Sequence, residues 1–156
     1  MNKPAPNPYL RTKIMTASPE ELRLLLYDGC LKFCRQGRTA LAAEKPDFEA
    51  IYENLMRAQK IVLELSTSLN HTAAPDLCEK LGALYTYIYR LLVDGNMQRD
   101  PSKIDEAIQL MEFERETWVM LMDKKRPQQD TGGPAAAAPM NPYAQQTALS
   151  SYSKSA

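Results

Sequence analysis

Four long segments of the sequence repeat apolar residues at intervals of three and four, and each begins at a helix-start signal. The first signal, Ser18-Pro19-Glu20-Glu21, combines a capping hydroxyl, a proline where no donor is needed and a glutamate that reaches back to the cap. Later starts are expected at Asp47, Pro75 and Asp100-Pro101. No stretch alternates with the period of two that a strand requires, so the sequence predicts an all-α fold.

The predicted helices are similar in length and are joined by short turns. They cover about residues 19–43, 48–70, 75–95 and 101–122, and each is roughly 35 Å long at 1.5 Å per residue. Such helices pack antiparallel, which predicts an up-and-down four-helix bundle. We assign this bundle to residues 18–125.

The two ends of the chain differ from the bundle in composition. Residues 1–17 contain three prolines before Tyr9 and predict an extended N-terminal arm. Residues 126–156 are rich in Pro, Ala and Ser and poor in large apolar side chains. Such a segment buries too little surface to offset its ordering entropy, so we expect a disordered C-terminal tail.

Composition also limits the partners and the compartment. Lys plus Arg and Asp plus Glu both number 19, so no net charge favours nucleic acid or an anionic membrane. No apolar run approaches the roughly 20 residues of a membrane helix, and the start of the chain has no signal-peptide core. Three cysteines, an odd number within helical patterns, fit a reducing compartment. We expect a cytoplasmic protein without membrane insertion.

The sequence contains little that supports catalysis or cofactor binding. Its single histidine, His71, lies near a helix end without a visible nucleophile partner. Cys30, Cys34 and Cys78 lack the paired spacing of structural zinc sites and are interpreted as small buried hydrophobes. No phosphate-binding glycine loop or nucleophile elbow is present. We therefore expect no enzyme activity, no metal and no cofactor.

The helices carry more apolar surface than one bundle seam requires. One interpretation is a thick core softened by methionine, or an obligate homodimer that buries the excess. The other is a groove for foreign amphipathic helices, which the eight methionines and several tyrosines suit. The pattern alone leaves both interpretations open.

A family resemblance becomes specific at Thr16-Ala17-Ser18-Pro19-Glu20-Glu21-Leu22 followed by Leu25-Leu26-Tyr27-Asp28-Gly29. It continues through Ala58-Gln59-Lys60-Ile61-Val62 and Leu84-Tyr85-Thr86-Tyr87 to Trp118. In order and spacing these motifs resemble the flagellar secretion chaperone family, FliS. Gly95, where alanine is common in the family, is one departure from the pattern.

The resemblance implies a cytosolic chaperone of a flagellated bacterium. Its client would be the C-terminal helical segment of flagellin, bound one-to-one, kept from premature polymerisation and delivered for type III flagellar export. It further implies contacts with the export gate and an assembly-factor regulator, although no residue of the sequence points to either.

The predicted partner-binding residues fall into two groups. Tyr9 and Ile14 are expected as arm contacts that compete with the client, because the resemblance implies that the arm lies in the apolar cleft when flagellin is absent. Around the cleft we expect Leu26, Tyr27, Tyr85, Tyr87, Ile88 and Leu91. Some of these are core residues in the alternative interpretation, in which the hydroxyls of Tyr27 and Tyr85 anchor helix packing with Asp28 as an acceptor. Trp118 is expected to pack the end of the bundle.

One triplet occurs at both ends of the chain. Asn7-Pro8-Tyr9 in the arm recurs as Asn141-Pro142-Tyr143 in the tail. We hypothesise that the tail copy also docks in the cleft, with chance recurrence in proline-rich sequence as the alternative.

Overall fold

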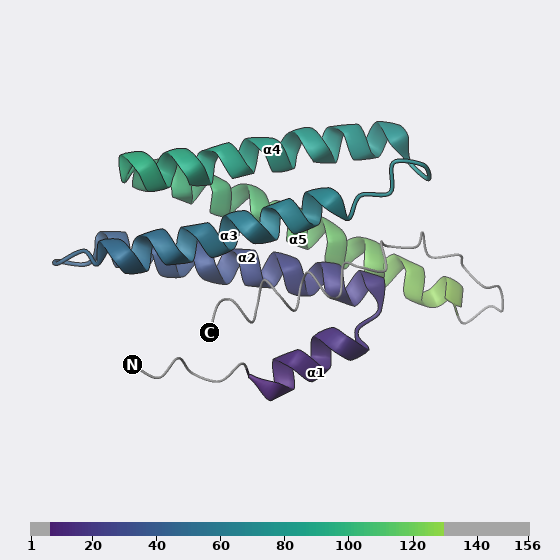
Figure 1. The fold of residues 1–156 in the computed structure, drawn as a ribbon. Helices are drawn as coiled ribbons and strands as arrows, with labels where there is room; N and C mark the ends of the chain where they lie inside the picture. The colour runs from purple at the N-terminus through teal and green to yellow at the C-terminus, as the bar shows by residue number, and fades with distance from the viewer. Residues whose placement is uncertain (1–6, 130–156) are drawn as a thin grey trace.

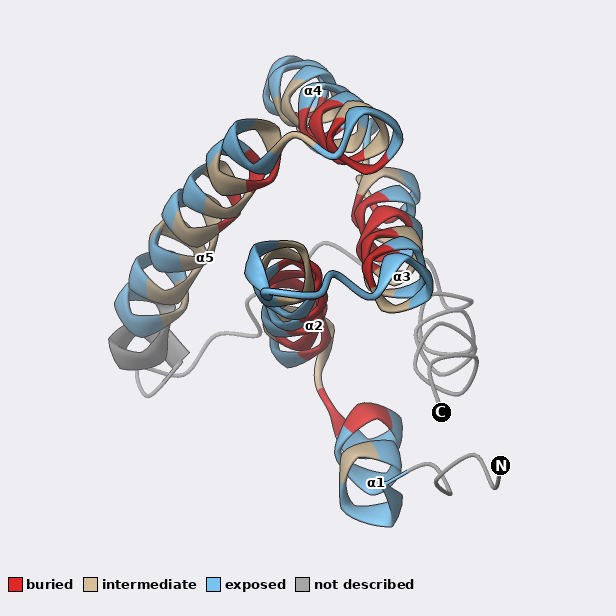
Figure 2. Cartoon of the chain, turned by 90° about the vertical axis from the view of Figure 1, so that its left-hand side faces the viewer, coloured by how far each residue is buried: buried red, intermediate tan, exposed pale blue. Residues whose placement is uncertain are grey.

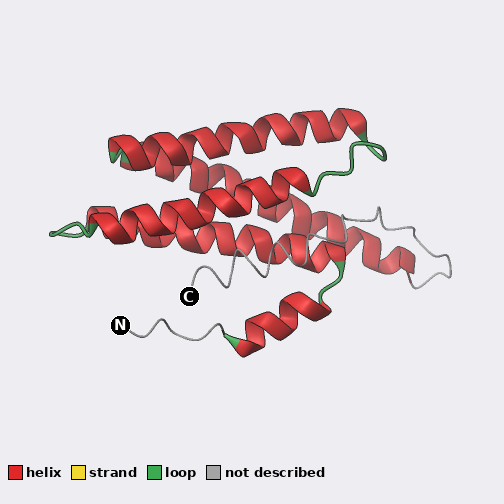
Figure 3. Ribbon diagram, viewed as in Figure 1, coloured by secondary structure: helices red, strands yellow, loops and turns green. Residues whose placement is uncertain are grey.

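The structure is a computed structural model that describes residues 7–129, with side chains up to Lys124. Five helices follow one another along this part of the chain, and it contains no strand (Figure 3). They are α1 (Pro8–Thr16), α2 (Pro19–Ala42), α3 (Phe48–Thr67), α4 (Pro75–Gln98) and α5 (Pro101–Gln129). None of the described helices is both long enough and apolar enough to cross a membrane.

The predicted helix starts are confirmed at atomic detail. The Ser18 hydroxyl accepts a hydrogen bond from the Glu21 amide at 3.2 Å, and the Glu21 carboxylate accepts one from the Ser18 amide at 3.2 Å. Asp47 caps α3 by accepting from the Ala50 amide at 3.1 Å. These bonds satisfy amide donors that a helix start leaves without intrahelical partners.

Helices α2 to α5 form the predicted antiparallel bundle (Figure 1). Both α2 and α4 contact α3 and α5, so α2 and α4 lie diagonally opposite each other. Buried residues occupy the inward faces of all four helices (Figure 2). Fully buried anchors of this core include Leu22, Leu26, Ile51, Leu55, Ile88 and Ile104. Burial of such side chains is the main driving force for packing the bundle.

The arm differs from the extended chain that the prolines suggested. Residues Pro8–Thr16 form α1, whose first turn is capped by the Asn7 side chain accepting from the Tyr9 amide at 3.0 Å. Pro8 occupies the first helical position, where its missing N–H costs nothing. The prediction of an extended arm was therefore wrong for this stretch, because Pro8 begins a helix instead of preventing one. The helix lies beside α2 in both views and buries Ile14 (Figures 1 and 2).

Three helix ends differ from the predicted boundaries. Helix α3 ends at Thr67 and not near Asn70, and α4 ends at Gln98 and not near Gly95. Helix α5 continues to Gln129 and not to about Met122. Residues 126–129 therefore belong to α5, although they were assigned to the tail. The rest of the predicted tail, including Asn141-Pro142-Tyr143, lies outside the described residues.

A tight turn joins α4 to α5 and sets their relative direction. Arg99 adopts a left-handed conformation with φ of 54°, and the Asp100 amide donates to the Gly95 carbonyl at 3.1 Å. From this turn the two helices diverge toward the opposite end of the bundle (Figures 1 and 2). The space between the start of α4 and the end of α5 is therefore wider than at the turn.

A candidate binding cavity at the open end of the bundle

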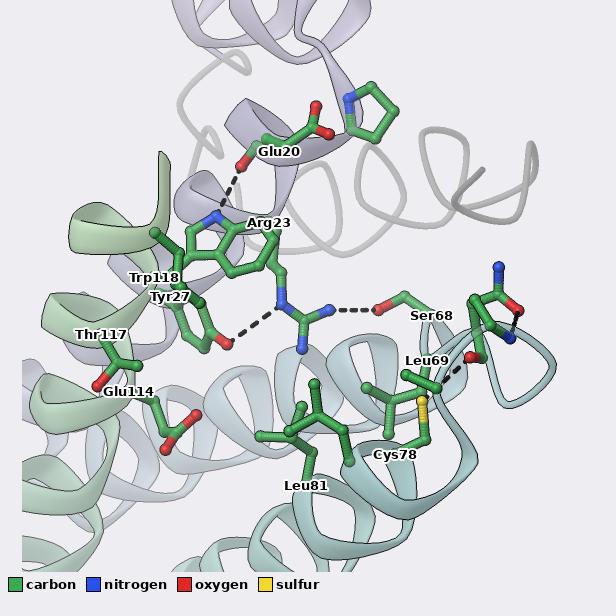
Figure 4. Close-up of a pocket in the computed structure, with 16 residues that line it drawn as sticks. Glu20, Arg23, Tyr27, Ser68, Leu69, Cys78, Leu81, Glu114, Thr117 and Trp118 are labelled. Atoms are coloured by element: carbon green, nitrogen blue, oxygen red, sulfur yellow. Dashed lines mark hydrogen bonds between the residues drawn. The ribbon is translucent and has the colours of Figure 1, made fainter. Parts of the chain in front are cut away.

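A cavity of about 340 Å³ lies where α4 and α5 diverge (Figure 4). Its walls come from the start of α2, the connection between α3 and α4, the start of α4 and the second half of α5. The lining is mainly apolar and includes Pro19, Leu69, Leu77, Leu81, Trp118 and Leu121. Leu77 remains 58% exposed and Leu121 47% exposed, so large apolar side chains reach from the cavity to the surface. An apolar cavity with this rim is a candidate site for another molecule.

Arg23 is a buried cation in the wall of this cavity, only 6% exposed. Its Nε donates to the Tyr27 hydroxyl at 3.2 Å, its Nη1 to Ser68 Oγ at 3.2 Å and its Nη2 to the Tyr85 hydroxyl at 2.6 Å. These bonds join α2, α3 and α4 across the bundle. Burial lowers the pKa of Arg23, but Tyr85 and Tyr27 raise it more, so the guanidinium remains protonated.

Trp118 closes the wall between α5 and α2. Its indole Nε1 donates to the Glu20 carbonyl at 3.0 Å, and its ring lies 5.3 Å from the Arg23 guanidinium carbon. The indole therefore ties the second half of α5 to the first turn of α2, as a packing residue at the end of the bundle was expected to do.

Glu114 adds a half-buried carboxylate to the same cavity. Burial raises its pKa, and the positive charge of Arg23 opposes this shift. No ion pair joins the two side chains. The cavity lining thus includes one cation, Arg23, and two carboxylates, Glu20 and Glu114, and no ion pair joins Arg23 to either of them.

The structure places most of the predicted cleft residues inside the bundle. Five of them are buried in the core: Leu26, Tyr27, Tyr85, Ile88 and Leu91. Tyr27 also lines the cavity, whereas Tyr87 is 46% exposed elsewhere on α4 and donates from its hydroxyl to Glu106. The alternative interpretation of Tyr27 and Tyr85 as packing anchors agrees with their positions.

Three further predictions concern single side chains. The Tyr27 and Tyr85 hydroxyls form hydrogen bonds with each other and with Arg23. Asp28 instead accepts a hydrogen bond from Arg115 Nε at 2.5 Å, so the prediction that Asp28 is the acceptor of the tyrosine hydroxyls was wrong. In the arm, Ile14 is fully buried, but Tyr9 is 73% exposed and does not line the cavity. The three cysteines are buried and free, as expected of small hydrophobes.

Sequence reasoning missed the residues that distinguish this cavity. Arg23 interrupts an otherwise apolar run from Leu22 to Leu26. Charged residues are seldom buried, so an arginine within this run was a signal of a polar site inside the bundle. Leu77 has the helical spacing of a core residue, yet it lines the cavity and is 58% exposed. The divergence of α5 from α4 carries no local sequence signal.

An antiparallel helical bundle with an apolar, partly open cavity belongs to the class of helical domains that can bind an apolar ligand or an amphipathic helix of another chain. Comparison with known proteins is more specific. The family model described as Flagellar protein FliS matches residues 1–125, and the chain belongs to this family. The resemblance seen in the sequence is therefore confirmed.

Curated relatives support the same assignment. The chain is 38% identical over 118 residues to the flagellar secretion chaperone FliS of Bacillus subtilis, covering 76% of this chain and 86% of the relative. It is 29% identical over 117 residues to that of Campylobacter jejuni, covering 75% and 90%. The Salmonella typhimurium protein is 28% identical over 116 residues, covering 74% and 84%. The family is one of chaperones and not of enzymes, and it gives no support to the homodimer alternative.

Proposed function

We propose that the chain is a cytosolic chaperone that binds the C-terminal helical segment of flagellin one-to-one, prevents its premature polymerisation and delivers it for type III flagellar export. The observation that carries this proposal is the open apolar cavity between α4 and α5 in a member of the FliS family. The export gate and an assembly-factor regulator are further proposed partners, on the ground of family membership alone.

The cavity suits a client that is disordered until it binds. An amphipathic client helix buries its apolar face against Leu77, Leu81 and Leu121, which the free chain leaves partly exposed. Ordering such a segment costs about 2–5 kcal/mol or more, which a large apolar interface offsets. The complex also covers the client face that would otherwise polymerise.

The predicted contact residues have distinct roles in this proposal. Tyr27 contacts the client from the cavity wall, and the buried Leu26, Tyr85, Ile88 and Leu91 hold that wall in place. Tyr9 and Ile14 are contacts of the arm, now helix α1, that compete with the client. Tyr87 is a peripheral contact on the exposed face of α4.

Calorimetric titration with the C-terminal segment of flagellin from the same organism tests the proposal. We expect a one-to-one complex of submicromolar affinity and a negative heat-capacity change from apolar burial. Leu77→Ser should weaken binding by about tenfold, because it removes apolar contact area from the rim. Met97→Ser is the matched control, since Met97 is an exposed apolar residue of α4 that lies outside the cavity.

Two results would contradict the proposal in different ways. Absence of binding, both by the full chain and by a variant without residues 1–17 and 126–156, would remove flagellin as the client. Equal losses for the Leu77 and Met97 variants would leave the client in place but move its site away from the cavity.

A further inference from the structure

Arg23 is the most buried arginine in the described part of the chain, and it forms no ion pair with an acidic side chain there. Arg35, Arg38 and Arg115 each bond a carboxylate at 2.5–2.7 Å on the surface of the bundle. Arg23 instead bonds three neutral hydroxyls. A guanidinium has five N–H donors, so two of those on Arg23 have no acceptor among the residues that the structure describes.

Aromatic rings offset only part of the cost of this buried charge. The Arg23 guanidinium carbon lies 5.6 Å from the Tyr27 ring centroid, 5.8 Å from that of Tyr85 and 5.3 Å from that of Trp118. Cation–π contacts of this kind are weaker than a hydrogen-bonded ion pair in the same low-dielectric setting. An anion that entered the cavity could therefore accept hydrogen bonds from the two unused N–H groups of the Arg23 guanidinium, which is already held in position.

The other charged groups of the cavity do not supply that anion. The Glu20 carboxylate points away from the guanidinium (Figure 4), and the Glu20 backbone carbonyl is used by Trp118. Glu114 stands on the α5 wall without an ion pair to Arg23. The rest of the lining is apolar or neutral.

We infer that Arg23 is the receptor for the C-terminal α-carboxylate of the client, which enters the cavity end-on. This inference rests on the proposed function, because a C-terminal client segment necessarily carries that group. Arg23 is 6% exposed, so only a protruding end of the client can reach it. The last turn of a helix also leaves carbonyl oxygens unpaired and carries partial negative charge, which the two available donors complement.

The test compares two peptides of the flagellin C-terminal segment, one with a free carboxylate and one with a terminal amide. Each is titrated calorimetrically into the full chain, into Arg23→Met and into Arg57→Met. Arg57 is the matched control because it is partly buried, contacts the Phe33 ring and lies outside the cavity.

We expect amidation to weaken binding to the native chain by about ten- to hundredfold, as loss of a charged hydrogen-bonded partner does. The Arg23 variant should bind both peptides with the same reduced affinity, and the Arg57 variant should behave like the native chain. If Arg23→Met does not fold, as judged by circular dichroism, the two peptides on the native chain still decide the question.

Each other outcome overturns the inference. Equal binding of both peptides to the native chain would leave flagellin as the client and exclude the terminal carboxylate as the ligand of Arg23. A further outcome is that the amidated peptide binds the native chain as tightly as the free-carboxylate peptide but fails to bind Arg23→Met. That result would mean that Arg23 binds a side-chain carboxylate of the client instead of its terminal carboxylate. Absence of binding by either peptide would overturn the proposed function and this inference together.

Discussion

The Tyr27 hydroxyl on α2 and the Tyr85 hydroxyl on α4 lie 2.8 Å apart inside the bundle. These residues are 58 positions apart in the chain, and their helices lie diagonally opposite each other. Arg23 donates to both hydroxyls, at 3.2 Å and 2.6 Å. The three side chains thus form a buried hydrogen-bonded cluster that joins α2 to α4 beside the cavity.

Tyr85→Phe should destabilise the fold by about 1–3 kcal/mol, because it removes the acceptor of the buried Arg23 Nη2 and the hydrogen bond between the two tyrosine hydroxyls. The free energy of unfolding is measured by urea titration with circular dichroism. Tyr87→Phe is the control on the same helix, where an exposed hydroxyl is lost and the cost should stay below about 0.5 kcal/mol. Equal effects of the two substitutions would show that the buried tie adds nothing to stability.

Gly95→Ala should also destabilise the protein. An added Cβ would lie 2.9 Å from Cγ1 of Ile104, which is fully buried and cannot move aside. We expect a net cost of about 1–2 kcal/mol, since overpacking outweighs the gain in helix propensity.

Gly82→Ala is the matched control for this glycine. Its added Cβ would meet the Leu69 side chain at 3.9 Å, which is an ordinary contact. We expect the free energy of unfolding of this variant, measured by thermal or urea denaturation, to rise by about 0.5–1 kcal/mol. A stabilising Gly95→Ala would show that the α4–α5 turn adjusts more freely than its close contacts indicate.

Glu114→Gln should stabilise the protein near neutral pH and have less effect in acid. Burial raises the pKa of Glu114 in the folded state, so its protonated form is favoured there. The stability that depends on protonated Glu114 is fully present below the pKa of the unfolded state and is lost as the pH rises through the pKa of the folded state. The gain at about pH 7 should be a few tenths of a kcal/mol, because solvent screens a half-exposed group.

The measurement is the unfolding free energy of both proteins at several pH values between about 4 and 7. Glu116→Gln, an exposed glutamate on the same helix, is the control. A difference for Glu114→Gln that grows toward acid would have the wrong sign and would contradict the assigned cause.

Local signals were sufficient to predict the helix starts and the bundle. The Ser18 capping box and the Asp47 cap act within four residues of sequence, and the structure contains both. The start of α1 escaped prediction although its signal is also local, because Asn7-Pro8 was read as a reason for extension and not as a cap followed by a first helical proline. Proline at that position permits a helix.

The cavity could not be predicted because it depends on how two helices diverge. Leu77 and Leu26 occupy similar positions in apolar stripes, yet Leu77 is 58% exposed and Leu26 is buried. Which stripe residue meets a neighbour depends on the direction that α5 takes from its turn at Arg99. One polar partner of Tyr27, Arg23, lies four residues away on the same helix, but the other, Tyr85, is on α4 and could not be predicted from local sequence.

Deleting residues 130–156 tests the hypothesis that Asn141-Pro142-Tyr143 docks in the client site. The same triplet caps and starts α1 at Asn7-Pro8-Tyr9, so it is a helix-start signal in this protein. A tethered segment at an effective concentration of about 1 mM, with an intrinsic dissociation constant of about 0.1–1 mM, weakens client binding roughly 2–10-fold. The deletion should tighten flagellin binding by this factor in calorimetric titration. Tyr143→Ser should reproduce the gain, whereas Tyr152→Ser, outside the triplet, should not. An unchanged affinity after the deletion would mean that the triplet recurs by chance, because a docked tail must compete with any client that uses the same site.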